Sequence, residues 1–305
     1  MPEPEFTHID NFEKIIVLGK DLVAASDKGY RLNFSLKVAF GVDLLKTPQL
    51  LDAAERAEDF QKIERPEFLY LNHGEYITAD GIPHVINELK NKDTGNRALI
   101  SLINQKDIIG SGDTPIPSFM VLQFSLEDDQ LYITVYFRAL EVSKFLRINL
   151  EEIRLVAKRI YDSNRKIKDI KLNVFSFRAY VRDDFNPLER PAIELLDDIE
   201  ILKLMEKKPK ELCRLLREKL KASTVIENNS LTVMNQIITD NNKNQELNPC
   251  FKIAPTKRKL QRCLELSSQL IDMRKSASHA PDLEDVNKHY MAALSDLIEE
   301  IEKCE

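Results

Sequence analysis

Residues 115–153 read PIPSFMVLQFSLEDDQLYITVYFRALEVSKFLRINLEEI, and the fold class follows from the pattern within them. Two strand-like runs, 119–126 and 130–140, are separated by the acidic residues 127–129, which favour a turn. The pattern predicts an antiparallel pair of strands. In the second strand both faces carry apolar side chains, so we expect the sheet to be covered on both sides.

The end of this stretch predicts a helix. Asn149 is followed three positions later by Glu152, a spacing typical of the capping box at a helix start. Ile153, Val156 and Ile160 then recur at helical spacing. A further strand is expected at 169–181, so strand, helix and strand alternate in the middle of the chain.

Mixed elements are also expected on the N-terminal side of this stretch. They are a helix at 9–25, a strand at 31–40, helices at 48–60 and 83–89, and a strand at 97–103. Residues 65–82 contain Gly74 and Gly81 and are expected to be irregular. The fold class predicted for this part of the chain is α/β of the α+β type, with a mixed sheet and flanking helices.

From about residue 190 the pattern is helical only. A helix is expected to begin at Pro209, residues 224–250 are polar and expected to form a loop, and two amphipathic helices follow. The last helix carries an apolar stripe that must be buried in a core or against a partner, formed by Val286, Tyr290, Leu294, Leu297 and Ile301. We therefore expect a first domain at 1–198 and a helical C-terminal domain at 199–305.

The composition is typical of a globular protein. The chain has 305 residues, of which 43% are apolar and 31% charged. No apolar run approaches the roughly 18 residues that span a membrane. The acidic N-terminal residues do not have the layout of a signal peptide. These features predict a cytoplasmic protein without a membrane partner.

Cysteine and charge distribution narrow the functional classes further. The four cysteines, Cys213, Cys250, Cys263 and Cys304, have no zinc-ligand spacing, so neither a metal site nor a cofactor is expected. Residues 1–200 hold 34 acidic and 26 basic side chains, a net charge of −8. Such an acidic region argues against a broad nucleic-acid surface, and a phosphate ligand would need locally clustered arginines.

Three blocks resemble thymidylate synthases and the related pyrimidine hydroxymethylases. The first is PHVINELKNKDTGNRALISLI, residues 83–103; the second is the stretch at 115–153; the third is SFRAYVRDDF, residues 176–185. In the family a strand ending in Gln-Phe precedes a strand that ends with an arginine, and an asparagine follows eleven residues later. Arg138 and Asn149 have this separation here. The resemblance implies a thymidylate-synthase-like sheet and a homodimer paired through its sheets.

The resemblance also implies that the family's chemistry is lost. The reaction needs a thiolate that adds to C6 of a pyrimidine nucleotide. Ser118 occupies the position of the nucleophilic cysteine and Phe119 that of the adjacent histidine. A serine hydroxyl is a poor nucleophile without a positioned base, and phenylalanine cannot serve as one. We therefore expect no catalytic residue.

Binding residues of the family are retained in part. Arg138 matches the principal phosphate arginine, and Arg97 matches an arginine that reaches the phosphate from the partner subunit. Asn149 matches the asparagine that reads the pyrimidine ring, and Tyr180 the tyrosine that contacts the sugar. Arg178 replaces the family's histidine and is either a surface charge or a new anion contact. From the residues alone, Asn149 also fits a helix cap, Arg138 and Arg97 fit solvated charges, and Tyr180 fits a half-buried aromatic.

The predicted site therefore comprises Arg97, Ser118, Arg138, Asn149, Arg178 and Tyr180. The leading hypothesis is a non-catalytic family member that binds a pyrimidine nucleotide or a related signal. It would pass that state to a protein partner through residues 200–305, as in a bacterial nucleotide-linked defence system. The alternatives are a structural scaffold with a vestigial pocket and an enzyme with rewired nucleotide chemistry.

Overall fold

The chain folds into two compact units. The computed structural model describes residues 6–93, 95–110, 115–182, 188–221, 225–240, 246–277 and 282–303. Unit 1 comprises residues 1–66, 71–110 and 116–187, and unit 2 comprises residues 67–70, 111–115 and 188–305. The main division falls between residues 187 and 188, earlier in the chain than the boundary expected after residue 198.

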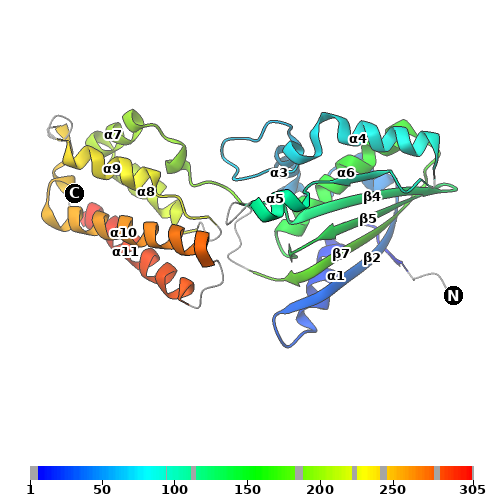
Figure 1. Cartoon of the computed structure of the whole chain (residues 1–305), viewed down its shortest axis with the longest axis horizontal. Helices are drawn as coiled ribbons and strands as arrows, with labels where there is room; N and C mark the ends of the chain where they lie inside the picture. Colours follow the sequence, from blue (N-terminus) through cyan, green and yellow to red (C-terminus); the bar gives the residue numbers. More distant parts are fainter. Residues whose placement is uncertain are drawn as a thin grey trace. The chain divides into compact units, whose positions relative to one another are not determined.

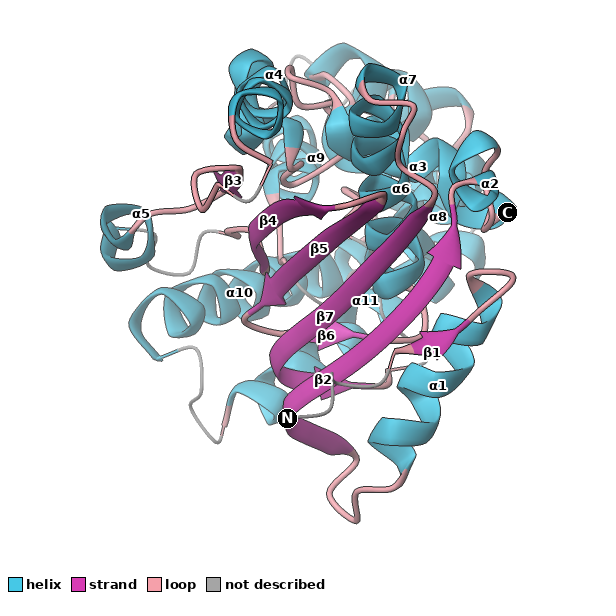
Figure 2. Cartoon of the chain, turned by 90° about the vertical axis from the view of Figure 1, so that its right-hand side faces the viewer, coloured by secondary structure: helices cyan, strands magenta, loops and turns pink. Residues whose placement is uncertain are grey.

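Unit 1 is built on a seven-stranded mixed sheet (Figures 1 and 2). Its strands are β1 (Thr7–His8), β2 (Tyr30–Gly41), β3 (Leu99–Ser101), β4 (Phe119–Glu127), β5 (Gln130–Phe137), β6 (Leu140–Glu141) and β7 (Asp169–Tyr180). Their order is β1-β2-β7-β5-β4-β3, and β6 pairs with β7. β5 and β7 are parallel, whereas β2 runs antiparallel to β7 and β4 antiparallel to β5. The chain is therefore mixed α/β, as the sequence predicts.

Helices cover one face of this sheet. Alternate strand residues such as Phe34, Leu122 and Leu172 are buried on that face. The helices of unit 1 are α1 (Glu13–Ala24), α2 (Asp43–Lys46), α3 (Leu51–Gln61), α4 (Gly74–Asn91), α5 (Gln105–Gly110) and α6 (Phe145–Ser163). α3 packs on α6, and in Figure 2 the strands face the viewer with α6 behind them.

The other face of the sheet is open in the single chain, and no helix in the described part of unit 1 covers it. The expectation of a sheet covered on both sides is therefore wrong for one chain. At one end of the open face Tyr136 stacks on Phe175 and Phe177 is 53% exposed, whereas Tyr132 meets Phe6 at the other end and Leu99 is exposed on β3. Thr134 and Gln123, nearer the middle, are polar and exposed.

α4 corrects the expectation that residues 65–82 are irregular. It begins at Gly74, contains Gly81 and Pro83, and is kinked at Thr78, whose φ is 62°. A Cβ atom at position 74 would overlap the carbonyl oxygens of Gln61 and Lys62 at the end of α3. Gly74 is thus a point of close approach between α3 and α4, not a break between elements.

α6 begins earlier than the spacing of Asn149 and Glu152 predicts. The Glu141 carboxylate accepts hydrogen bonds from the backbone N–H groups of Ser143, Lys144 and Phe145, at 2.9, 2.7 and 3.0 Å. A side chain from the preceding strand thus satisfies the free donors at the helix start. Asn149 lies inside the helix and is fully buried, so the prediction that it caps the helix is wrong.

Unit 2 is helical. It contains α7 (Asp198–Lys207), α8 (Pro209–Lys219), α9 (Asn229–Thr239), α10 (Ala254–Ala277) and α11 (Leu283–Lys303) (Figure 1). α9 corrects the loop expected at 224–250, because Leu231, Met234 and Ile238 supply a buried stripe. The apolar stripe of α11 lies in the core of unit 2, where Leu294, Leu297 and Ile301 are fully buried. That stripe is therefore not an exposed partner surface.

Among the described residues, no helix combines the length and apolar character needed to cross a bilayer.

Candidate functional site at one edge of the sheet

Four of the predicted site residues lie at the same edge of the sheet. Arg138 directly follows β5, and Arg178 and Tyr180 lie at the end of β7, which runs parallel to β5. Ser118 directly precedes β4, which runs antiparallel to β5. The end of β5 therefore meets the start of β4, and the Arg138 backbone N–H donates to the Ser118 carbonyl at 3.0 Å. Loops at the carboxyl ends of parallel strands are common ligand sites.

Arg138 contacts the segment that precedes Ser118. Its Nη2 donates to the Ile116 carbonyl at 3.1 Å, and its Nε lies 3.4 Å from the Pro117 carbonyl. Burial lowers the pKa of the Arg138 guanidinium below its ordinary value. A guanidinium remains charged under such conditions, so Arg138 places a fixed positive charge at this edge.

Tyr180 lies among further arginines at the same edge. Burial raises the pKa of its hydroxyl and Glu141 raises it further, whereas Arg182, Arg178 and Arg138 act in the opposite direction. The Arg178 guanidinium lies over the ring of Tyr30, 4.1 Å from its centroid. The acidic unit 1 therefore has a local concentration of positive charge where β5 and β7 end.

Ser118 and Phe119 do not form a nucleophilic pair. Phe119 stacks on Phe137 with ring centroids 4.5 Å apart and meets the ring of His73 edge-on at 5.4 Å. Ser118 is half-buried, and within the described ranges no histidine or carboxylate bonds its hydroxyl. The cysteines of the described residues, Cys213, Cys250 and Cys263, are buried in unit 2. Burial raises the pKa of the Cys263 thiol to about 12.

Asn149 belongs to a buried polar cluster centred on Glu152, which we call the Glu152 cluster. The Glu152 carboxylate accepts from His73 Nδ1 at 2.8 and 2.9 Å and from Asn149 Nδ2 at 3.0 Å. Gln61 Nε2 donates to the same carboxylate at 3.0 Å. His73, Asn149 and Glu152 are all 0% exposed. The cluster adjoins the edge residues through the contact between His73 and Phe119.

Three atoms of this region are buried without a hydrogen-bond partner. They are His73 Nε2, Asn149 Oδ1 and the Oδ1 atom of Asn72, whose Nδ2 donates to the Lys62 carbonyl. An unsatisfied buried polar atom costs roughly 1–3 kcal/mol, so native proteins keep few of them. Three in one region indicate that a group from outside the chain, water or ligand, completes the bonding.

His73 has no equivalent among the residues predicted from sequence. Its backbone N–H donates to the Phe60 carbonyl at 2.8 Å, and its ring is flanked by Phe60 and Phe145. The close approach at Gly74 holds the segment in place. The available signal was the polar pair Asn72–His73 between the apolar Leu71 and the glycine. Only the tertiary fold shows that this pair is buried.

Arg97 is not part of this edge in a single chain. It lies in the turn before β3, and the neighbouring Ala98 carbonyl accepts from the Phe124 N–H at 2.9 Å. Phe124 is five residues along β4 from Phe119, roughly 17 Å at the usual rise of a strand. Arg97 therefore cannot act on the same ligand as Arg138 unless it comes from a second chain.

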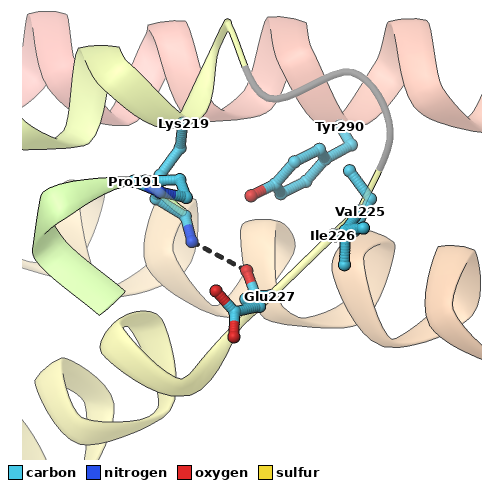
Figure 3. A pocket seen from close by; sticks show the side chains of 6 residues that line it. All are labelled: Pro191, Lys219, Val225, Ile226, Glu227 and Tyr290. Carbon is cyan, nitrogen blue, oxygen red and sulfur yellow. Dashed lines mark hydrogen bonds between the residues drawn. The ribbon is translucent and has the colours of Figure 1, made fainter. Parts of the chain in front are cut away.

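Unit 2 contains a small pocket lined by Pro191, Lys219, Val225, Ile226, Glu227 and Tyr290 (Figure 3). It has room for about one water molecule. The Lys219 ammonium is paired with the buried Glu194 carboxylate and donates to the Glu227 carbonyl at 2.7 Å. The pocket is too small for a nucleotide, and its charged side chains are paired within unit 2, Lys219 with Glu194 and Glu227 with Arg190.

Metal chemistry and known relatives give no further guide to the site. In the part of the chain that the structure describes, no three His, Cys, Asp or Glu residues gather as metal ligands. No protein-family model and no curated protein matches the chain.

Proposed function

We propose that unit 1 is a non-catalytic module of the thymidylate-synthase type that binds a pyrimidine nucleotide or a related nucleotide. We also propose that the helical C-terminal region passes the bound state to a partner protein. The observation that carries the proposal is the positive sheet edge next to the Glu152 cluster with its unpaired acceptors. A nucleotide has a phosphate that suits the arginines and a base whose N–H groups suit the acceptors.

Each predicted residue has a role in this proposal. Arg138 binds the phosphate, because its planar fork makes paired, charge-assisted hydrogen bonds to phosphate oxygens. Asn149 faces the base, and Tyr180 contacts the sugar. Ser118 and Arg178 line the site without taking part in chemistry. Arg97 comes from a neighbouring subunit.

Calorimetry with pyrimidine nucleotides and their nucleosides tests the binding function. We expect Arg138→Ala to weaken nucleotide binding about tenfold to a hundredfold, because hydrogen bonds to charged groups contribute roughly 1.5–3 kcal/mol. Nucleoside binding should change little. Arg165→Ala, at an exposed arginine beyond the other end of α6, is the matched control. Equal affinity of the wild type for nucleotide and nucleoside would contradict the phosphate role of Arg138.

Absence of thymidylate synthase and hydroxymethylase turnover is a separate part of the proposal. It is supported by Ser118 and Phe119 at the positions where the family has its nucleophile and histidine. The assay is tritium release from C5-labelled dUMP and dCMP in the presence of folate cofactor. No release above the buffer blank is expected, and turnover that disappears in Ser118→Ala would contradict the proposal.

A homodimer formed through the open face of the sheet completes the proposed site. Tyr136, Phe175 and Phe177 form an apolar area at the end of this face nearest Arg138. A second copy on this face would cover that area and could supply Arg97. Light scattering should show a dimer for the full chain and a monomer for Phe177→Asp, with Val17→Asp on α1 as the control at an exposed residue. A monomeric wild type would remove the support for Arg97.

A structural scaffold is the second candidate function, and one observation favours it. The Arg138 guanidinium is already bonded to the carbonyls of Ile116 and Pro117, as expected of an arginine that only holds a loop. These contacts use Nε and one N–H of Nη2, so a phosphate would have to bind through the remaining N–H groups. If no nucleotide binds and Arg138→Ala lowers thermal stability instead, the scaffold function is the better one.

A further inference from the structure

Four residues that lie between α3 and α4 in the sequence belong to unit 2. They are residues 67–70, and the chain returns to unit 1 at Leu71. Backbone contacts join this segment to residues 188–190. These contacts are the antiparallel bridge between Leu69 and Glu189, the hydrogen bond from the Tyr70 N–H to the Leu188 carbonyl at 2.9 Å, and the one from the Arg190 N–H to the Phe68 carbonyl at 2.8 Å. A piece of the N-terminal sequence is thus held by the helical unit.

The Glu227 side chain fixes this segment further. Its carboxylate accepts from the Tyr70 hydroxyl at 3.1 Å and from Arg190 Nε and Nη2 at 3.2 and 2.9 Å. The bonds from the guanidinium are charge-assisted, and both charged side chains are largely buried. The Glu227 carbonyl is itself held by Lys219 at 2.7 Å (Figure 3). We call Tyr70, Arg190 and Glu227 the Glu227 clamp, and it is anchored within unit 2.

The residues after Tyr70 lead directly into the Glu152 cluster. Leu71 is buried in unit 1, and the His73 backbone N–H donates to the Phe60 carbonyl at 2.8 Å. The His73 Nδ1 atom lies 2.8 Å from the Glu152 carboxylate. Three residues of extended chain span at most about 11 Å, and both ends of this stretch are bonded. A displacement of Tyr70 therefore cannot be absorbed by slack before His73.

His73 also contacts the positive edge of the sheet. Its ring meets the ring of Phe119 edge-on, with centroids 5.4 Å apart, and Phe119 directly follows Ser118. The Ser118 carbonyl accepts from the Arg138 N–H at 3.0 Å. Residues 71–74 are thus in contact with the residues that set the position of Arg138.

The backbone is strained where residues 67–70 are held. Leu188, whose carbonyl binds the Tyr70 N–H, has a φ of 61°. A bulky residue avoids this left-handed region, and it persists there only where surrounding bonds hold it. Strained positions of this kind occur often in switch regions. Loss of the bonds to residues 67–70 would allow Leu188 to relax, which favours a second arrangement of the segment.

We propose that the Glu227 clamp positions residues 71–74, so that unit 2 controls the ligand-binding edge of unit 1. The proposal rests on the nucleotide-binding function proposed above and names the connection through which the bound state reaches the C-terminal region. Tyr70, Arg190 and Glu227 are positioning residues, because they act on a ligand only through His73 and the residues that it contacts. Coupling of this kind is reciprocal, so a ligand at the edge must also tighten the clamp.

Hydrogen exchange of the full chain without ligand, measured by mass spectrometry, tests the connection. Glu227→Ala removes the carboxylate that both Tyr70 and Arg190 bind. The amides of residues 71–77 should then exchange at least about tenfold faster, the effect of losing one hydrogen bond to a charged group. The amides of β7 should be unchanged, because a local opening does not unfold the sheet. Acceleration of both regions by the same factor would overturn the inference, since it would reflect general loss of stability.

Two further variants sharpen this test. Tyr70→Phe removes the hydroxyl alone and should accelerate exchange of residues 71–77 by a smaller factor, again with β7 unchanged. Glu211→Ala is the matched control, because it removes a glutamate that pairs with Arg214 on the same helix of unit 2. It should leave both regions unchanged. If Glu227→Ala does not fold, Tyr70→Phe decides the question, and unchanged exchange of residues 71–77 in the folded variants would overturn the inference.

The same measurement with dUMP tests transfer of the bound state. In the wild type, dUMP should slow the exchange of residues 71–77 and of residues 188–195. In Glu227→Ala the slowing at 188–195 should be lost. Protection confined to residues 71–77 in the wild type would overturn the inference and leave nucleotide binding intact. Failure of dUMP to bind in calorimetry would instead contradict the proposed function, and exchange of the free variants would still decide whether the clamp positions the segment.

Discussion

Two buried glutamates, Glu152 in unit 1 and Glu194 in unit 2, are satisfied in different ways. The Glu194 carboxylate is paired with the Lys219 ammonium and accepts from the backbone N–H of Ser230 at 3.1 Å and from its hydroxyl. Glu152 has no lysine or arginine partner among the described residues and accepts from His73, Asn149 and Gln61. The pair in unit 2 is neutralised within the chain, whereas the Glu152 cluster ends in unpaired atoms.

The difference separates a structural role from a binding role. A buried ion pair whose partners bind one another has little to offer a ligand, and its removal acts on stability. A carboxylate that orients neighbouring side chains and leaves their outer atoms unpaired resembles the supporting groups behind binding residues. The comparison therefore favours ligand binding by unit 1 and leaves unit 2 a well-packed helical body.

Removing one partner of the buried pair in unit 2 should give the largest effect. Lys219→Met leaves the Glu194 charge buried without compensation, which costs about 3–5 kcal/mol. Urea denaturation should show this loss. Arg214→Met removes an arginine that is 58% exposed, so it should lower the free energy of unfolding far less. Similar effects of the two variants would break the distinction between the units.

Gly74→Ala should give a smaller loss of stability in unit 1. The added Cβ would overlap the carbonyl oxygens at the end of α3. Overpacking of this kind lowers the free energy of unfolding by about 1–3 kcal/mol. Because His73 is the adjacent residue, the variant should also weaken nucleotide binding. Gly41→Ala is the control, since no atom lies within 4 Å of a Cβ built there. A Gly74→Ala protein with full stability would show that the segment is less closely held than the structure indicates.

The sheet could be predicted from the sequence because alternation is local. Residues 119–126 and 130–140 correspond to β4 and β5, and the expected strand at 169–181 corresponds to β7. The order of strands and the helix-covered face could not be predicted, because they depend on contacts between distant segments. The open face illustrates this limit, since apolar residues in a strand do not show whether a helix or a second chain covers them.

The candidate site could be predicted only in part. The resemblance to thymidylate synthases pointed to Arg138, Ser118 and Tyr180, and the three residues lie at one edge of the sheet. The sequence allowed two roles for Asn149, a helix cap and a base contact. The capping role is excluded, because the carboxylate of Glu141 on β6 caps α6 instead. Gln61 carries no local signal of its own, and the polar pair Asn72–His73 does not by itself show that His73 is buried beside Glu152. Polar clusters of this kind require tertiary structure to be recognised.

The smallest expected effect concerns acid sensitivity at the surface of unit 1. Arg147 on α6 binds Glu13 on α1 at 2.7 Å and Asp52 on α3, and the Arg147 side chain is 17% exposed. Hydrogen bonding to this guanidinium lowers the pKa of both carboxyls. A lowered pKa in the folded state stabilises the protein above the ordinary carboxyl pKa, and this contribution is lost as the pH falls through the lowered value.

Arg147→Gln should therefore destabilise the protein at pH 7 and have progressively less effect as the pH falls below about 4. The two carboxylates are 55% and 62% exposed, so solvent screening limits the loss to less than about 1 kcal/mol. Urea denaturation of both proteins at pH 7 and pH 3 measures the difference. Arg214→Gln in unit 2 is the comparison, because among the described residues Arg214 pairs along its own helix, with Glu211 and Glu218. Arg147 instead joins three helices of unit 1, so Arg147→Gln should lower the free energy of unfolding more than Arg214→Gln does. Equal decreases would mean that bridging between helices adds nothing to these exposed pairs.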